Sequence, residues 1–161
     1  MERSKALQEL KTFIERSMEH VPDGDTDHSL VILKAHLLSE EVLCEFIYGR
    51  LPHAERLHLE RSHWSFSNKR ELAMACSEVH AESNWVWEGL RRLNRLRNLY
   101  GHQLEPDDIE AQKGNFVSFI EESVPEQLLY EEVTLRRAAE LLLFGLYSIC
   151  KFPYLSADRG A

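Results

Sequence analysis

The chain has 161 residues, of which 43% are hydrophobic and 29% are charged, and this size and composition predict one globular domain with a continuous core. No stretch approaches the roughly 18 to 20 apolar residues of a membrane span, and residues 1–5 lead into a charged stretch without a signal-peptide core, so we expect a cytoplasmic protein without membrane contact. The formal net charge of -8 disfavours a protein that coats nucleic acid nonspecifically, because its field would repel phosphates.

Helical periodicity begins near the N-terminus. Apolar residues at helical spacing predict a helix over about 4–20, and the turn residues 21–24 end it. A second helix is expected over about 28–48, with Asp27 as its N-terminal cap. Its apolar residues cover enough of its circumference to pack on more than one side. We therefore expect this second helix to be the central one.

Shorter helices follow in the middle of the chain. Pro52 is suited to the first turn of a short polar helix, and Ser67 or Asn68 is expected to cap another. Asn84 is a candidate cap for a longer amphipathic helix over about 85–100. This amphipathic helix carries the residues that distinguish the chain chemically.

The last part of the chain completes an all-α pattern. Gly101 is expected to end the helix over 85–100, and Pro106 opens a further helix. A last helix is predicted over about 127–151, followed by a short disordered tail over about 154–161. Strand signals are nearly absent, so the fold class is an all-α, single-domain bundle of about five to seven helices that spans residues 1–161.

Two sets of residues that often carry chemistry are interpreted as structural. The cysteines are odd in number, far apart and in apolar surroundings, which indicates reduced core thiols; they are Cys44, Cys76 and Cys150. Three histidines are spaced by five residues, which turns successive ligands about 140° apart, whereas zinc-binding helices use a spacing of four; they are His53, His58 and His63. We therefore predict neither a metal site nor a cofactor.

An arginine-rich segment at 89–102 departs from the acidic background. It contains no acidic residue and four arginines, which are Arg91, Arg92, Arg95 and Arg97. On a helical wheel of about 100° per residue, Arg97 falls inside the apolar arc that Leu90, Leu93, Leu96 and Tyr100 define. Arg91 and Arg95 point to the opposite side, where solvent explains their charge. Only Arg97 requires a specific partner for its charge.

His102 is the second candidate functional residue. It follows Arg97 by five residues, so a continuous helix would turn the two side chains about 140° apart. Gly101 can adopt a positive φ, end the helix and bring His102 back toward Arg97. An arginine that holds a phosphate and a histidine that transfers protons are the groups needed to cleave RNA without a metal. Asn98 would orient the phosphate or the imidazole, and Tyr100 would stack on a base.

The run Arg97-Asn98-Leu99-Tyr100-Gly101-His102 resembles the motif of the HEPN superfamily of helical domains: an arginine, a polar residue, three further residues and a histidine at a helix end. The specific match covers about residues 66–104. This segment is similar to the mannitol-repressor-like branch of the superfamily. The resemblance implies a homodimer in which two motifs face each other across a cleft. It also implies a metal-independent endoribonuclease, as in many members that act as toxins of toxin-antitoxin pairs or as antiviral effectors.

The same resemblance leaves a non-catalytic alternative open. Other members only bind RNA, nucleotides or protein partners, and a regulator of this kind would use the same cleft without turnover. An antitoxin or a regulatory protein is a candidate partner. Where relatives paired with nucleotidyltransferase antitoxins carry a tyrosine two residues after the histidine, this chain has Leu104, so control through that tyrosine is not supported. Together with Asn98 and Tyr100, Arg95 is expected to help bind the substrate.

A purely structural interpretation competes with both. Arg97 would then form a salt bridge with an acidic residue of the second helix, for which Glu40, Glu41 and Glu45 are the candidates. His102 would cap the free carbonyl groups at the end of its helix. In that case the chain would be a helical subunit without a ligand at this position.

Overall fold

The computed structural model describes residues 2–19, 27–61, 63–78, 83–102, 108–129 and 131–151, and the expected tail over 154–161 lies outside this part. The elements are α1 (Glu2–Met18), α2 (His28–Arg50), the 3₁₀ helix η1 (Ala54–Leu57), α3 (Phe66–Cys76), α4 (Asn84–His102), α5 (Ile109–Ser123), the 3₁₀ helix η3 (Glu126–Leu128) and α6 (Leu135–Lys151). The described residues include no strand, and the predicted all-α helical bundle is confirmed.

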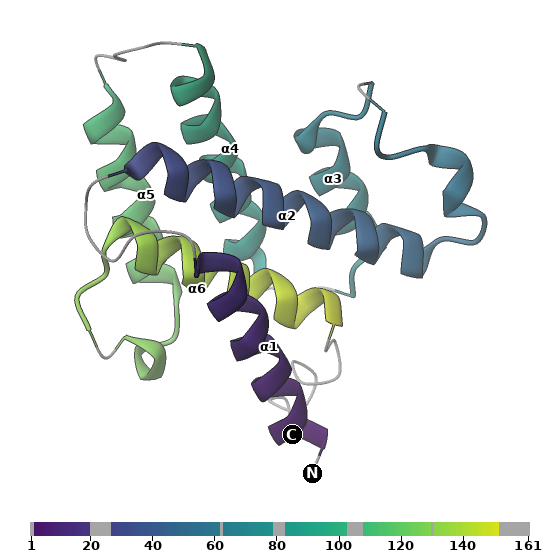
Figure 1. The fold of residues 1–161 in the computed structure, drawn as a ribbon, viewed down its shortest axis with the longest axis horizontal. Helices are drawn as coiled ribbons and strands as arrows, with labels where there is room; N and C mark the ends of the chain where they lie inside the picture. Colours follow the sequence, from purple (N-terminus) through teal and green to yellow (C-terminus); the bar gives the residue numbers. More distant parts are fainter. Residues whose placement is uncertain are drawn as a thin grey trace.

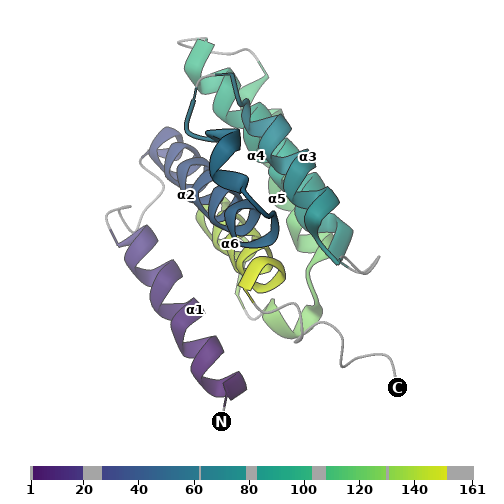
Figure 2. The same ribbon diagram turned by 90° about the vertical axis from the view of Figure 1, so that its right-hand side faces the viewer.

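The helices form three layers around α2 and α6. Figure 1 shows α2 running across the middle of the molecule above α6, and Figure 2 shows α3, α4 and α5 on one side of this pair and α1 on the other. α2 packs against α1, α3, α4 and α6, and it is buried along most of its length. The prediction that the second helix is the central one is therefore confirmed.

The helix ends agree with the sequence at some positions and differ at others. The Asp27 side chain accepts a hydrogen bond of 3.0 Å from the backbone N–H of Leu30, which confirms its capping role. The expected cap at Ser67 or Asn68 is wrong, because the Ser65 hydroxyl accepts the bond from the N–H of Asn68 and α3 begins at Phe66. The short helix after Pro52 is a single 3₁₀ turn.

The last predicted helix begins later than expected. Residues from 127 onward first form η3, and α6 starts only at Leu135. The Thr134 hydroxyl accepts a hydrogen bond of 3.2 Å from the N–H of Arg137, as an N-terminal cap does. Thr134 therefore marks the start of α6 within an apolar stretch that periodicity alone extends too far.

Two glycines let α4 lie close to α6. A Cβ added to Gly89 would lie 2.6 Å from the Leu142 Cδ1 atom. On the other helix, a Cβ added to Gly145 would lie 2.7 Å from the Trp85 ring. α4 is also anchored by Leu90, which is fully buried. The spacing between α4 and α6 is thus set by glycine on both sides.

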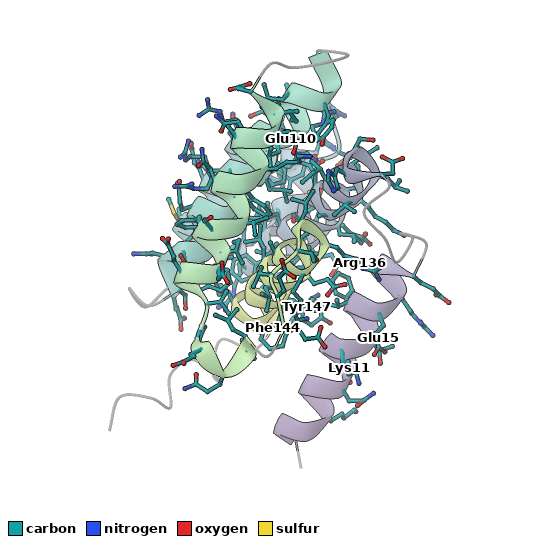
Figure 3. The ribbon with its side chains drawn as sticks, turned by 90° about the vertical axis from the view of Figure 1, so that its left-hand side faces the viewer. Lys11, Glu15, Glu110, Arg136, Phe144 and Tyr147 are labelled. Carbon is teal, nitrogen blue, oxygen red and sulfur yellow. The ribbon has the colours of Figure 1, made fainter. Side chains whose placement is uncertain are left out.

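α1 packs on the outer side of α6. The Phe13 and Tyr147 rings stack with their centroids 4.8 Å apart, and Figure 3 shows Phe144 and Tyr147 on the side of α6 that is nearest α1.

At the end of α6, burial raises the pKa of the Cys150 thiol to about 12. None of the described helices is both long enough and apolar enough to cross a membrane.

Candidate functional site

α4 does not end at Gly101. The helix continues through Gly101 to His102, and the φ angle of Gly101 lies outside the left-handed region, so the predicted break is wrong. A glycine inside the last turn satisfies the same pattern as a glycine after the helix, which is why the sequence did not separate the two cases. Positions 97 and 102 of one chain are therefore about 140° apart around the axis of α4. The His102 side chain and Leu104 lie outside the described part of the chain.

Arg97 is half-buried, and its guanidinium keeps no carboxylate partner among the described residues. Its Nη1 atom donates a hydrogen bond of 3.3 Å to the Asn98 Oδ1 atom. The same nitrogen would lie 3.6 Å from a Cβ added to Gly101, so the guanidinium extends along α4 over a residue without a side chain. Arg97 thus has the charge, the partial shielding and the free donors that an oxyanion requires.

The acidic residues expected to neutralise Arg97 are used elsewhere. The Glu40 carboxylate pairs with Lys69 of α3, whose side chain is almost fully buried, at 2.5 Å. Glu45 pairs with Lys151 at the end of α6, at 2.7 Å. Glu41 is exposed and forms no ion pair with Arg97. The structure therefore does not contain the salt bridge that the purely structural interpretation requires.

A buried histidine, His36 of α2, is close enough to Arg97 for the charge of Arg97 to act on it. The His36 side chain is 5% exposed, its Nε2 atom is 3.0 Å from the Asn94 Oδ1 atom, and its ring packs against Phe66 with the centroids 4.2 Å apart. Burial lowers the pKa of His36, and the charges of Arg97 and Lys69 lower it further, against the opposing effects of Asn94 and Glu40.

His36 is a residue of this site that the sequence prediction does not include. A histidine in the middle of the apolar run 28–48 was a visible signal, because a buried imidazole needs a hydrogen-bond partner. The partner, Asn94, is 58 residues away in the chain. Only the packing of α2 against α4 reveals the pair.

The other predicted site residues are divided between two sides of α4. Asn98 is exposed beside Arg97. Tyr100 is half-buried against the core, and burial raises its pKa together with the nearby carboxylates of Glu110 and Asp27. Arg95 does not join Arg97; it lines a hollow between α4 and α5. The arrangement around Arg97 can bind an oxyanion through Arg97 and Asn98, with Tyr100 on the neighbouring side of the helix.

Among the described residues, no three histidine, cysteine, aspartate or glutamate side chains are grouped closely enough to hold a metal ion. His53 and His58 flank η1 with left-handed backbones, at φ angles of 62° and 50°. Each of the two pairs with a glutamate two residues further on. These histidines shape a turn at the end of α2 that is remote in sequence from Arg97.

The helical conformation of Gly101 predicts that Gly101→Ala stabilises the protein by about 0.5–1 kcal/mol, because alanine loses less backbone entropy than glycine in a helix. Urea unfolding measures this change. The matched control is Gly114→Ala, at an exposed position of α5 where an added Cβ meets nothing within 4 Å. If Gly101→Ala destabilises the protein while Gly114→Ala stabilises it, Gly101 has a left-handed conformation in solution.

The burial of His36 predicts a pH-dependent stability. The folded protein keeps His36 neutral where the unfolded chain, with the ordinary pKa of 6.5, takes up a proton. The contribution of neutral His36 to the free energy of unfolding should therefore be complete above pH 6.5, and the free energy of unfolding should decrease as the pH falls below 6.5. Urea unfolding between pH 5.5 and 7.5 should show a weaker dependence for His36→Gln. The exposed control His53→Gln should retain the wild-type dependence, and an identical slope in all three proteins would contradict the assignment.

Comparisons with known protein families, curated proteins and solved structures give no match to this chain. The resemblance to the HEPN superfamily therefore stays a prediction from the motif at Arg97 and His102. A function for this chain has to be inferred from the chemistry of its own residues.

Proposed function

We propose that the chain is a metal-independent endoribonuclease of the HEPN type, which binds an RNA phosphate at Arg97 and acts as a homodimer. The observation that carries this proposal is the Arg97 guanidinium, which has no carboxylate partner among the described residues and donates to Asn98 at the surface of a half-buried residue. A guanidinium that no carboxylate neutralises keeps charged donors free for an anion. A phosphate of a bound RNA strand would supply that anion.

The proposed reaction uses the two residues of the motif and solvent water. His102 accepts the proton of a 2′-hydroxyl, whose oxygen attacks the adjacent phosphorus while the bond from phosphorus to the 5′-oxygen breaks. The leaving 5′-oxygen takes a proton from solvent water, and the protonated His102 then returns its proton to solvent. The products are a 2′,3′-cyclic phosphate and a 5′-hydroxyl. Arg97 stabilises the additional negative charge on the phosphate oxygens in the transition state.

The unbroken α4 favours a site shared between two copies. Positions 97 and 102 of one helix are separated by about 140° and by about 7.5 Å along the axis, so one chain presents them on different sides. In a homodimer with two-fold symmetry, Arg97 of one copy and His102 of the other would meet, and the symmetry would create two such sites.

Cleavage of a mixed-sequence RNA in the presence of a chelator is the first test. Wild type should cleave, Arg97→Ala should lose about 10²–10³-fold of the rate through loss of charge stabilisation, and His102→Ala should lose about 10²–10⁴-fold through loss of proton transfer. The matched control, Arg56→Gln, removes the charge of an exposed arginine in η1 and should leave the rate unchanged. Absence of cleavage by wild type at every pH between 5 and 9 would contradict the nuclease function.

A mixing experiment tests the shared site. An equal mixture of the inactive Arg97→Ala and His102→Ala proteins should regain about a quarter of wild-type activity, because half of randomly paired dimers are mixed and each has one intact site. The two proteins must be unfolded together and refolded, or incubated long enough to exchange subunits. A mixture that stays inactive, although sedimentation shows mixed dimers, would place both residues of a site in the same chain.

The second candidate function is a non-catalytic module that binds RNA, a nucleotide or a protein partner with the same residues. The continuous helix through His102 favours it, because Arg97 and His102 of one chain do not converge. This function predicts binding of RNA by wild type, loss of binding in Arg97→Ala, and no cleavage. The chelator assay thus distinguishes the two functions.

A further inference from the structure

We propose that the hollow between α4 and α5 is a second phosphate-binding site, which holds the RNA strand next to the proposed cleavage site. The hollow has a volume of about 180 Å³ and is lined by Arg91, Arg92, Arg95, Gln112, Asn115 and Phe116. Three of these six residues carry a guanidinium and two carry a side-chain amide, whereas none carries a carboxylate. The assignment to RNA rests on the proposed function, but the assignment to a phosphate group rests on this lining.

Two of the three guanidinium groups are held in place before any ligand binds. Glu88 accepts hydrogen bonds from Arg91 at 2.6 and 2.7 Å and from Arg92 at 2.9 Å. The guanidinium of Arg92 also lies 4.2 Å from the centroid of the Phe119 ring and donates to the Asn115 carbonyl oxygen at 3.3 Å. A binding site that is already ordered loses less conformational entropy when a ligand arrives.

The charge balance of the hollow remains positive. The bonds from Arg91 and Arg92 lower the pKa of Glu88 to about 2, so this carboxylate stays ionised at neutral pH and neutralises one guanidinium. Three arginines against Glu88 leave two positive charges, and the carboxylate of Asp108 beside Gln112 reduces the net charge to one. Arg95 is exposed and has no carboxylate partner among the described residues. Asp108, the N-cap residue of α5, accepts a hydrogen bond of 3.3 Å from the Gln112 amide.

The ligand that fits this hollow is a phosphate group. Arginine forks bind phosphate oxygens through two parallel hydrogen bonds, and side-chain amides supply further donors. An RNA strand is favoured as its source, since position 102 lies about 20° around the helix from position 95 and about 10.5 Å further along α4. A strand that follows this side of α4 would run from the hollow to the position of His102.

Binding of a fluorescein-labelled, single-stranded 2′-O-methyl RNA of mixed sequence tests the proposal, because this probe lacks the attacking hydroxyl and stays intact. In fluorescence anisotropy with a chelator, Arg95→Gln should bind about tenfold more weakly than wild type. Its slope of log affinity against log salt concentration should decrease in magnitude by about 0.7, the value for one lost phosphate contact on a single strand. Arg91→Gln should show a change in the same direction.

The control is again Arg56→Gln, which carries the same change of charge in η1. If Arg95→Gln and Arg56→Gln bind the RNA equally well, the hollow is not a phosphate site for RNA. Inorganic pyrophosphate and polyglutamate serve as competitors. If pyrophosphate binds wild type but not Arg95→Gln, while both proteins bind the RNA equally well, the phosphate comes from a small molecule. If polyglutamate, and not pyrophosphate, binds wild type but not Arg95→Gln, the ligand is an acidic protein segment. Either result overturns the assignment to RNA.

The outcome is independent of the nuclease function. Binding of the RNA probe that depends on Arg95, together with no cleavage of ordinary RNA, would support the hollow and contradict the nuclease. Cleavage that depends on Arg97 and His102, together with normal RNA binding by Arg95→Gln, would support the nuclease and contradict the hollow.

Discussion

The chemistry of this protein depends on which side of α4 faces the core, because this orientation about the helix axis decides where each arginine lies. Leu90, Leu93 and Leu96 are at most 1% exposed, and each buried leucine contributes about 1.5–3 kcal/mol. An exposed ion pair such as that of Arg91 with Glu88 contributes about 0–1 kcal/mol, so the leucines and not the charges fix how the helix is turned. The arginines take the positions that remain. Arg97 therefore lies toward α2 and Arg95 toward α5.

The interface of α2, α3 and α4 is polar at its centre, although most of the core is aliphatic. His36 pairs with Asn94, and Lys69 pairs with Glu40. Polar pairs of this kind add little net stability, but a pair left incomplete is costly, so only one relative position of the three helices satisfies both. The same pairs leave Glu40 unavailable to Arg97. The packing of the bundle and the unpaired charge at its edge thus have a common origin.

Local patterns predicted the elements of this fold, and long-range contacts account for most of what they missed. The period of the apolar residues was sufficient for α2 and for the buried side of α4, because both are set by which residues avoid water. The apolar period predicts a start near 127 for α6, but residues 126–128 form the 3₁₀ helix η3 and the α-helix begins only after the Thr134 cap. Gly101 was misinterpreted because the same residue suits the interior and the end of a last turn. The partner of His36 comes from another helix and leaves no local trace.

The buried thiol of Cys150 can serve as a probe of local opening in this bundle. A thiol with a pKa of about 12 is almost entirely protonated at neutral pH, and Cys150 is also buried where α6 ends, beside the contact of Lys151 with Glu45. Because this thiol is buried, alkylating reagents reach it when this end of α6 opens. The rate of alkylation therefore reports the opening free energy of this end of α6, with the half-buried Cys44 and Cys76 as references in the same chain.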